Sequence, residues 1–371
     1  MPLPIAEAFA DLPDPRLDRN QLHTLSDILT IALCAVISGA EGWEQIAEYG
    51  RAKAAFFRRF LALPNGIPSH DTFYRVFTRL DPDRFAAGFG KWMAAACQGT
   101  GLIPIAIDGK SARRSRKDTF TGRLHLVGAW AAENRLVLGQ VSVADGSHEI
   151  AAIPDLLRML DLSGALVTLD AAGCQKGIAR QIREQGGDYL LAVKGNQPTL
   201  HHAVATVFER ACESDLTEVA CDLHSTEEDG HGRHEERFVT VIYDPQGLPP
   251  DWPDVAAVVF VGRERESQGR NASSGHYYIT SHRGTAAELG RLIRGHWGIE
   301  NGLHWVLDVA FREDESRTSA GHAGANLGLL RRVAVSLLKQ TGKHGSIQTR
   351  RMKAAWNDEY LLKVLQAITA T

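Results

Sequence analysis

The chain has 371 residues, of which 44% are hydrophobic and 23% charged, and its formal net charge is −3. This length fits two or three domains with well-buried cores, and the composition excludes a disordered chain. The net negative charge excludes a chain that is basic throughout, so a nucleic-acid surface has to come from local clusters of Lys and Arg.

The cysteines and the apolar runs indicate the cellular compartment in which the protein is expected to lie. None of the five cysteines forms a Cys-x-x-Cys pair, which is typical of a reducing compartment and not of a disulfide framework. The N-terminus shows no basic-then-apolar leader. The longest apolar run, residues 28–40, is shorter than the roughly 20 residues that cross a bilayer. We therefore expect a soluble cytoplasmic protein with no membrane partner.

Residues 1–95 carry the spacing of helices. Apolar residues recur at helical intervals over 25–33, and the ranges 43–49 and 52–61 are further helix candidates. Prolines and a glycine then interrupt the pattern, and a helix over 69–80 follows, with its first residue, a serine, placed to cap it. This succession fits a DNA-reading module and a plain helical packing module equally well.

Two arginines on the last of these helices are candidates for reading DNA sequence. Arg75 and Arg79 are four residues apart and share a face, from which they could reach guanine edges in a major groove. The apolar residues Phe73, Val76 and Phe77 fall on a different face and could pack the helix onto the rest of the protein. The two roles are therefore compatible.

From about residue 100 the chain alternates between strands and helices. The expected strands are 102–107, 124–131, 136–144, 165–169 and 188–193, and the expected helices are 150–160 and 174–185. This is the strand order of the ribonuclease H fold, provided that the first and fourth strands are parallel neighbours. We expect an α/β protein with a ribonuclease H-like core, a mixed five-stranded sheet with flanking helices, a β-rich insertion and an all-α N-terminal domain.

Two aspartates, Asp108 and Asp170, each follow an apolar strand of this core. Ligands of open α/β sheets bind where strands end, and parallel neighbouring strands would bring the two carboxylates within reach of a shared metal. Cleavage of a phosphodiester needs a nucleophile made from water and a stabilised leaving oxygen, and two Mg²⁺ ions roughly 4 Å apart supply both. An Asp after a strand is also often only a turn residue or a helix cap.

The stretch at residues 294–315, RGHWGIENGLHWVLDVAFREDE, resembles the H-repeat-associated (ISAs-type) insertion-sequence transposases, a DDE family. Further blocks resemble the same family, including its DDE-associated N-terminal domain: 66–73, 106–110, 147–150, 168–175 and 192–197. The resemblance covers nearly the whole chain.

This resemblance implies a transposase that cleaves DNA and transfers strands at insertion-sequence ends. It implies Asp108, Asp170 and Glu300 as the catalytic and metal-binding carboxylates, with two Mg²⁺ ions, or Mn²⁺ in their place, as cofactor. The expected partners are double-stranded DNA, as terminal inverted repeats and target, and a second copy of the chain on paired ends in a bacterial cell. The expected domains are 1–95 for end recognition, 96–345 for catalysis with an insertion at 196–275, and 346–371 as a helical tail.

Several polar side chains around these carboxylates are candidates for contact with DNA. A basic run directly follows Asp108, and Lys194 follows the fifth strand, where Asn196 and Gln197 either assist it or cap the next helix. The full set of candidates is Lys110, Arg113, Arg114, Arg116, Lys117, Lys194, Arg233, His296, His304, Arg75 and Arg79.

The chain departs from sister families around Glu300. Those families place Tyr, Arg and Lys at offsets −7, −4 and +7 from the catalytic Glu, where this chain has Ile293, His296 and Leu307. The roles of that Tyr and Lys are therefore not carried over. His296 and His304 lie one helical turn on either side of Glu300, where they could contact phosphate, orient the Glu or pack beside the neighbouring tryptophans.

Two other functions fit parts of the pattern. A stand-alone nuclease on the same fold would lack an end-recognition module, whereas about 95 residues precede this core. A domesticated DNA-binding protein would be indicated by the loss of a carboxylate, and all three are present.

Overall fold

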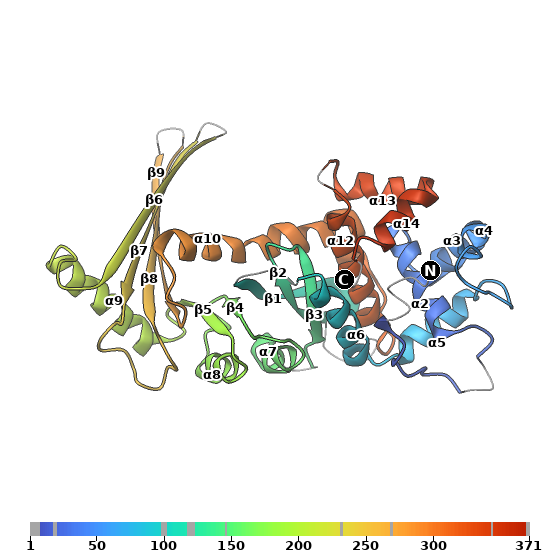
Figure 1. Ribbon diagram of the computed structural model, residues 1–371, viewed down its shortest axis with the longest axis horizontal. Coiled ribbons are helices and arrows are strands. Elements are labelled where there is room, and N and C mark those ends of the chain that lie inside the picture. Colours follow the sequence, from blue (N-terminus) through green and yellow to red (C-terminus); the bar gives the residue numbers. More distant parts are fainter. Residues whose placement is uncertain are drawn as a thin grey trace. The chain divides into compact units, whose positions relative to one another are not determined.

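The computed structural model describes residues 8–17, 21–97, 102–116, 123–144, 147–230, 233–267, 270–342 and 344–368. Its contacts divide the chain into two compact units (Figure 1). The first unit comprises Met1–Thr100, Gly109–Leu160 and Ile299–Thr371, and the second comprises Gly101–Asp108 and Asp161–Gly298. These units cut across the linear boundaries expected from the sequence, because the expected catalytic region contributes to both. Among the described residues, no helix is long and apolar enough to cross a membrane.

The N-terminal part of the first unit is helical, as expected. Its helices are α2 (Leu25–Ile37), α3 (Trp43–Ala52), α4 (Ala54–Phe57), α5 (His70–Arg79) and α6 (Pro82–Ala95). Their starts follow capping chemistry, because the side chains of Thr24, Ser69 and Asp81 accept hydrogen bonds from first-turn N–H groups. The expected helix over 52–61 is interrupted, since α4 ends at Phe57, where Phe56, Phe57 and Phe60 pack on one another.

The rest of the first unit surrounds helix α12 (Ala323–Gln340), which is buried along most of its length. It includes β2 (Arg123–Ala131), β3 (Leu136–Ser142), α7 (Glu149–Arg158), the π-helical turn η2 (Glu300–His304), α11 (Trp305–Phe311), the 3-10 turn η3 (Glu313–Glu315), α13 (Ile347–Trp356) and α14 (Asp358–Leu365). The Asn326 side chain of α12 donates to the carbonyls of Phe77 and Leu80, at 2.8 and 2.9 Å. The N-terminal helices are therefore tied to α12 by buried polar contacts as well as by apolar packing.

The second unit is built on parallel strands. The first half of β1 (Ile103–Arg116) pairs in parallel with β4 (Ala165–Leu169), and β4 pairs in parallel with β5 (Asp188–Val193). Helices α8 (Lys176–Glu184), α9 (Pro198–Glu213) and α10 (Ala286–His296) complete the unit with an antiparallel arm described below. Within the described residues the strand order is β3-β2-β1-β4-β5-β9-β8-β7-β6. The expected mixed α/β fold, with first and fourth strands parallel and adjacent, is confirmed.

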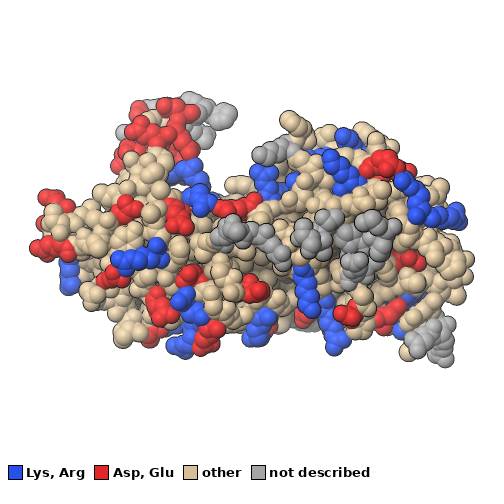
Figure 2. All heavy atoms as spheres, in the orientation of Figure 1, with Lys and Arg blue, Asp and Glu red and all other residues tan. Residues whose placement is uncertain are grey.

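The region expected as a β-rich insertion contains α9 and a long antiparallel arm. The arm consists of β6 (Cys221–Gly230), β7 (Arg233–Tyr243), β8 (Ala257–Ser267) and β9 (Arg270–Thr280). Strand β9 continues beyond residue 275 and pairs with β5, so the arm extends the core sheet. Figure 2 shows acidic side chains gathered at the end of the arm away from β5.

Candidate active site

The parallel register of β1 and β4 brings two of the predicted carboxylates to one level. Ala106 pairs with Thr168 and Ile107 with Leu169, so the next residues along the two strands are Asp108 and Asp170. Neighbouring strands lie about 4.8 Å apart, so Asp108 and Asp170 follow positions that are direct neighbours in the sheet. The prediction that Asp108 ends its strand is wrong, because β1 continues to Arg116. It is β4 that stops there, after Leu169.

The loop after β4 is braced from the loop after β5. The Oδ1 of Asp170 accepts a hydrogen bond from the N–H of Gly173, at 3.1 Å. The amide of Asn196 donates to the carbonyl of Ala171 at 2.6 Å, and that of Gln197 donates to the carbonyl of Cys174 at 3.0 Å. Asn196 and Gln197 therefore fix the conformation around Asp170 through backbone contacts.

His296 lies beside this pair of strands. Its Nδ1 is 2.9 Å from the hydroxyl oxygen of Thr168, two residues before Asp170. Burial lowers the pKa of His296, and the charge of Asp170 opposes this effect. The imidazole is therefore neutral at pH 7, and its position next to Thr168 suits it to orient the Asp170 segment.

Glu300 belongs to the first unit and opens the π-helical turn η2, which leads into α11. Its side chain is exposed, and single π turns inside helices occur often at functional positions. His304 closes the same turn, and burial lowers its pKa to about 3, with the charges of Arg332 and Lys110 acting in the same direction. The tryptophans on either side, Trp297 and Trp305, are exposed and do not pack into a core.

Lys110, the first member of the basic run, is already paired. Its ammonium nitrogen is 2.7 Å from the Oδ1 of Asp308 and 3.5 Å from the Oδ1 of Asp314, and the residue is 9% exposed. Contact with a DNA phosphate would require these ion pairs to open. Lys110 therefore joins β1 to α11 and η3 in this structure.

The other predicted DNA-contacting residues belong to several elements of the two units. Arg113, Arg114 and Arg116 continue along β1, Arg233 opens β7, and Lys117 lies outside the described residues. Lys194 is exposed after the last residue of β5. Arg75 and Arg79 are exposed on α5, on a different face from its buried apolar residues, as the helical spacing predicts.

A polar contact beside Asp108 was not anticipated from the sequence. On the Gly109 face of β1, the hydroxyl oxygen of Ser111 is 2.6 Å from the Nδ1 of His125, and the Nε2 of His125 is 3.4 Å from Glu149. A Cβ at Gly109 would lie 2.4 Å from the Glu149 carboxylate and 2.5 Å from His125. A side chain at position 109 would therefore displace the ends of the Glu149 and His125 side chains. Alternation along the strand is the signal that could have indicated this contact.

The residues present fit a hard divalent cation in donor chemistry. Carboxylate oxygens are the preferred ligands of Mg²⁺, and the register supplies two of them from β1 and β4. Among the residues that the structure describes, no group of three or more His, Cys, Asp or Glu is close enough together to hold a metal.

Comparisons with known proteins match two family models and several curated relatives. Residues 6–93 match the family model described as DDE_Tnp_1-associated, and residues 99–337 match the model described as Transposase DDE domain. The "H repeat-associated putative transposase YhhI" of Escherichia coli K12 is 38% identical over 370 residues, covering 97% of each chain. The "Uncharacterized protein in dhlA 3'region" of Xanthobacter autotrophicus is 47% identical over 285 residues, covering 76% of this chain and 95% of that protein.

Among solved structures, the piggyBac transposase synaptic complex with hairpin DNA is similar at a TM-score of 0.43 and 9% identity, covering 98% of this chain and 76% of that one. This similarity is too weak to carry a conclusion. The family-model matches and the full-length relatives establish that the chain belongs to the DDE transposases, with the H-repeat-associated members among its relatives.

Proposed function

We propose that this transposase cleaves DNA and transfers strands at insertion-sequence ends, with Asp108, Asp170 and Glu300 as its metal-binding carboxylates. The observation that carries the proposal is the β1–β4 register, which aligns Asp108 with Asp170. A strand pairing shifted by one residue would send the two side chains to opposite faces of the sheet. The proposed substrate is double-stranded DNA carrying the terminal repeats, bound by a homodimer on paired ends.

A divalent ion held by these carboxylates, Mg²⁺ or Mn²⁺, would supply a nucleophile from water and stabilise the leaving oxygen. The protein's own groups have to orient the carboxylates. Asp170 is held by the N–H of Gly173, its loop by Asn196 and Gln197, and its strand by the contact between Thr168 and His296. These contacts involve only groups of the protein, and in this proposal they keep the Asp170 segment oriented for the ion.

The test replaces each carboxylate by its amide, as Asp108→Asn, Asp170→Asn and Glu300→Gln. Each variant should lose cleavage of end DNA by on the order of a thousandfold, because the amide keeps the shape but not the charge that holds the cation. Binding of the same DNA without metal should persist, and chelation should abolish cleavage by the unaltered protein.

The matched control is Glu184→Gln, an exposed carboxylate of α8 that loses the same charge. It should cleave at the rate of the unaltered protein. Cleavage at that rate by any one of the three triad variants would remove that residue from the metal site.

A further inference from the structure

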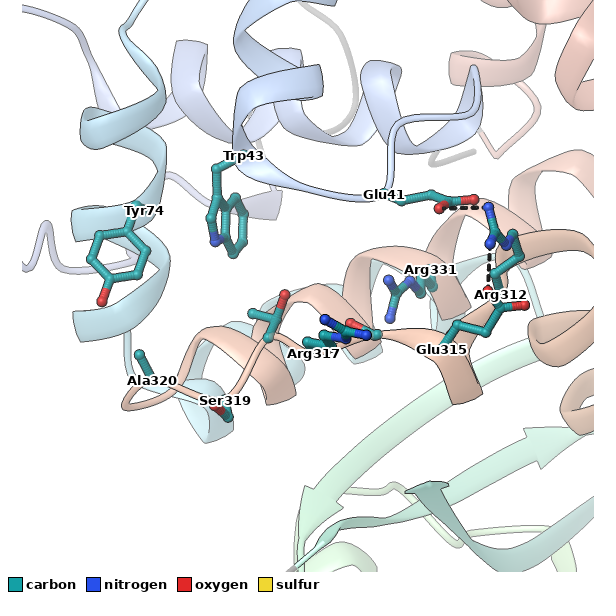
Figure 3. A pocket seen from close by; sticks show the side chains of 11 residues that line it. Glu41, Trp43, Tyr74, Arg312, Glu315, Arg317, Ser319, Ala320 and Arg331 are labelled. Carbon is teal, nitrogen blue, oxygen red and sulfur yellow. Dashed lines mark hydrogen bonds and ion pairs between the residues drawn. The ribbon is translucent and has the colours of Figure 1, made fainter. Parts of the chain in front are cut away.

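A cavity of about 450 Å³ opens in the first unit, and none of the three proposed carboxylates lines it. Figure 3 shows it between the start of α3, helix α5, the segment from Arg312 to Ala320, and α12. Its lining includes the aromatic rings of Trp43 and Tyr74 and the guanidinium groups of Arg312, Arg317 and Arg331. Its size lies in the range of small-ligand sites, about 300–1,000 Å³.

Arg331 is the buried charge of this cavity. The residue is 3% exposed, and none of the described residues forms a hydrogen bond or ion pair with its side chain. The other buried arginines of the same unit all have hydrogen-bond partners, for example Arg332 with Glu313 and Arg350 with the carbonyl of Leu338. Burial lowers the pKa of Arg331, opposed by the charges of Glu313 and Glu41. A buried charge without partners destabilises the protein until an anion reaches it.

The acidic side chains at the cavity do not satisfy Arg331. Glu41 is 3.4 Å from Arg312, which also pairs with Glu315. Arg312 reaches these partners from a left-handed backbone conformation, with φ of 50°, that non-glycine residues rarely adopt. Arg317 is exposed at the rim and has no hydrogen-bond partner among the described residues. Two cationic side chains therefore remain for a ligand.

Besides its arginines, the cavity is lined by aromatic side chains that offer flat apolar surfaces. Trp43 stacks on Phe77, with ring centroids 5.0 Å apart and planes 20° apart. Its ring is thus held in place by the helix core while it lines the cavity. Tyr74 is 41% exposed at the rim. Guanidinium groups bind phosphate and flat rings stack on bases, so the combination suits a nucleotide better than a free carboxylate or an apolar ligand.

We propose that this cavity binds one unpaired nucleotide of a DNA strand, with its phosphate on Arg331 and Arg317 and its base against Trp43 and Tyr74. The base has to be unpaired because a ring at a cavity wall cannot stack on a base that is enclosed in a duplex. The assignment to a DNA strand over a free nucleotide rests on the proposed function. The assignment to phosphate plus base rests on the cavity.

The test measures binding to the full-length protein without metal by fluorescence anisotropy, using a labelled thymidine pentanucleotide and an abasic strand of the same length. Arg317→Gln and Arg331→Met should each weaken binding of the pentanucleotide about tenfold or more. Tyr74→Ala should weaken it about fivefold or more and leave binding of the abasic strand unchanged. The control Arg58→Gln, an exposed arginine after α4, should change neither.

Arg331→Met has a second readout that a purely structural arginine would not give. Because it removes a buried charge that lacks a partner, it should raise the midpoint of thermal unfolding while it weakens binding. A lowered midpoint together with unchanged binding would assign Arg331 to the core. If this variant does not fold, binding by the rim variants Arg317→Gln and Tyr74→Ala is sufficient to test the proposal.

Unchanged pentanucleotide binding in both rim variants would overturn the proposal. Equal sensitivity of the abasic strand to Tyr74→Ala would overturn the role of the base. Competition by thymidine monophosphate as strong as by the pentanucleotide would identify a free-nucleotide site and overturn the assignment to a strand. Cleavage by the triad variants is measured separately, so failure of the cavity and failure of the proposed function give different results.

Discussion

Among single residues, His304 has the most strongly shifted pKa near the proposed catalytic turn. The folded protein keeps it neutral down to about pH 3, whereas the unfolded chain binds a proton near pH 6.5. Between these values the unfolded state binds one more proton than the folded state. The stability contributed by the neutral imidazole is present above pH 6.5 and is lost as the pH falls, by up to about 1.4 kcal/mol per pH unit.

We therefore expect His304→Gln to reduce the loss of stability between pH 7 and pH 5, since glutamine takes up no proton. The measurement compares urea unfolding of the two proteins at both pH values, so that any direct cost of the substitution cancels. His202→Gln, an exposed histidine of α9, is the control and should follow the unaltered protein. Equal losses in all three proteins would show that His304 binds its proton over the same pH range in the folded protein as in the unfolded chain.

The role of a single residue can be predicted from the sequence when the groups that it contacts lie near it in the chain. Asp108 and Asp170 could be singled out because each comes directly after a short apolar run, and the residues before them are neighbours in the sheet although β1 continues beyond Asp108. The ion pair of Lys110 with Asp308 could not be predicted, since Asp308 lies 198 residues away in the chain. Arg331 and Arg332 are adjacent in the middle of the largely apolar helix α12. Only the structure shows that Arg332 donates to the carboxylate of Glu313, whereas Arg331 lines a cavity.

At the scale of elements, the outer part of the β6–β9 arm has two chemically different faces. Paired residues of neighbouring strands share a face, and Glu227, Glu236 and Glu264 form one row across three strands. The adjacent row on the same face holds Asp229, His234 and Glu266. That row includes one ion pair, between His234 and Asp229. The opposite face holds several, including Glu235 with Arg237 and Arg263, and Glu228 with Arg294.

The acidic row should weaken both stability and DNA binding. Like charges directly opposite one another on a sheet repel, and a carboxylate face repels phosphate. The triple variant Glu227→Gln/Glu236→Gln/Glu264→Gln should therefore unfold at a higher temperature and bind random duplex more tightly at low salt. The control neutralises Glu184, Glu213 and Glu218, exposed acidic residues of the same unit outside the arm. An effect of equal size in the control would mean that total charge, not this face, is responsible.

Helix α5 is the element proposed to read the transposon ends. Its buried Phe73, Val76 and Phe77 hold it against the unit, which leaves Arg75 and Arg79 exposed on another face. Arg75→Ala/Arg79→Ala should lower the preference for end DNA over scrambled DNA, at about 1–3 kcal/mol for each lost base contact. The measurement is a binding competition, with Arg58→Ala/Arg84→Ala as a charge-matched control. An unchanged preference in the α5 variant would assign end reading to another element.

At the scale of the whole molecule, the N-terminal helices are part of a unit that three chain segments build together. Buried polar groups of the C-terminal segment depend on them: Asn326 donates to Phe77 and Leu80, Arg351 to Val36, and the carbonyl of Ile368 accepts from Trp92. Deletion of residues 1–95 should therefore give an aggregated or unfolded protein, because these groups lose their partners in the core.

The measurement is circular dichroism and size-exclusion chromatography of the shortened chain. A soluble, folded product would show that the helices are a separable module. Substitution of exposed residues, and not truncation, is accordingly the way to test their role in recognition.

Much of the architecture was predictable because strands and helices of the core follow regular apolar spacing. The parallel strands β4 and β5 match their expected ranges, since each is a short apolar run bounded by polar or turn residues. The sequence could not predict which segments join in one unit, because the joining contacts link residues hundreds of positions apart. Examples are Asn326 of α12 with Phe77 and Arg351 of α13 with Val36. The insertion was expected to end at residue 275, whereas β9 continues to Thr280. The polar outer half of the arm lacks the apolar alternation that marks a strand.

The pairing of β9 with β5 has a consequence for shorter relatives and for engineered chains. Without that pairing, β5 would end the parallel sheet with a row of unsatisfied N–H and C=O groups, which is a template for association with another chain. The arm therefore protects the sheet from edge-to-edge assembly. A chain cut back between β5 and α10 would be expected to form filaments or amorphous aggregates before any question of its chemistry arose.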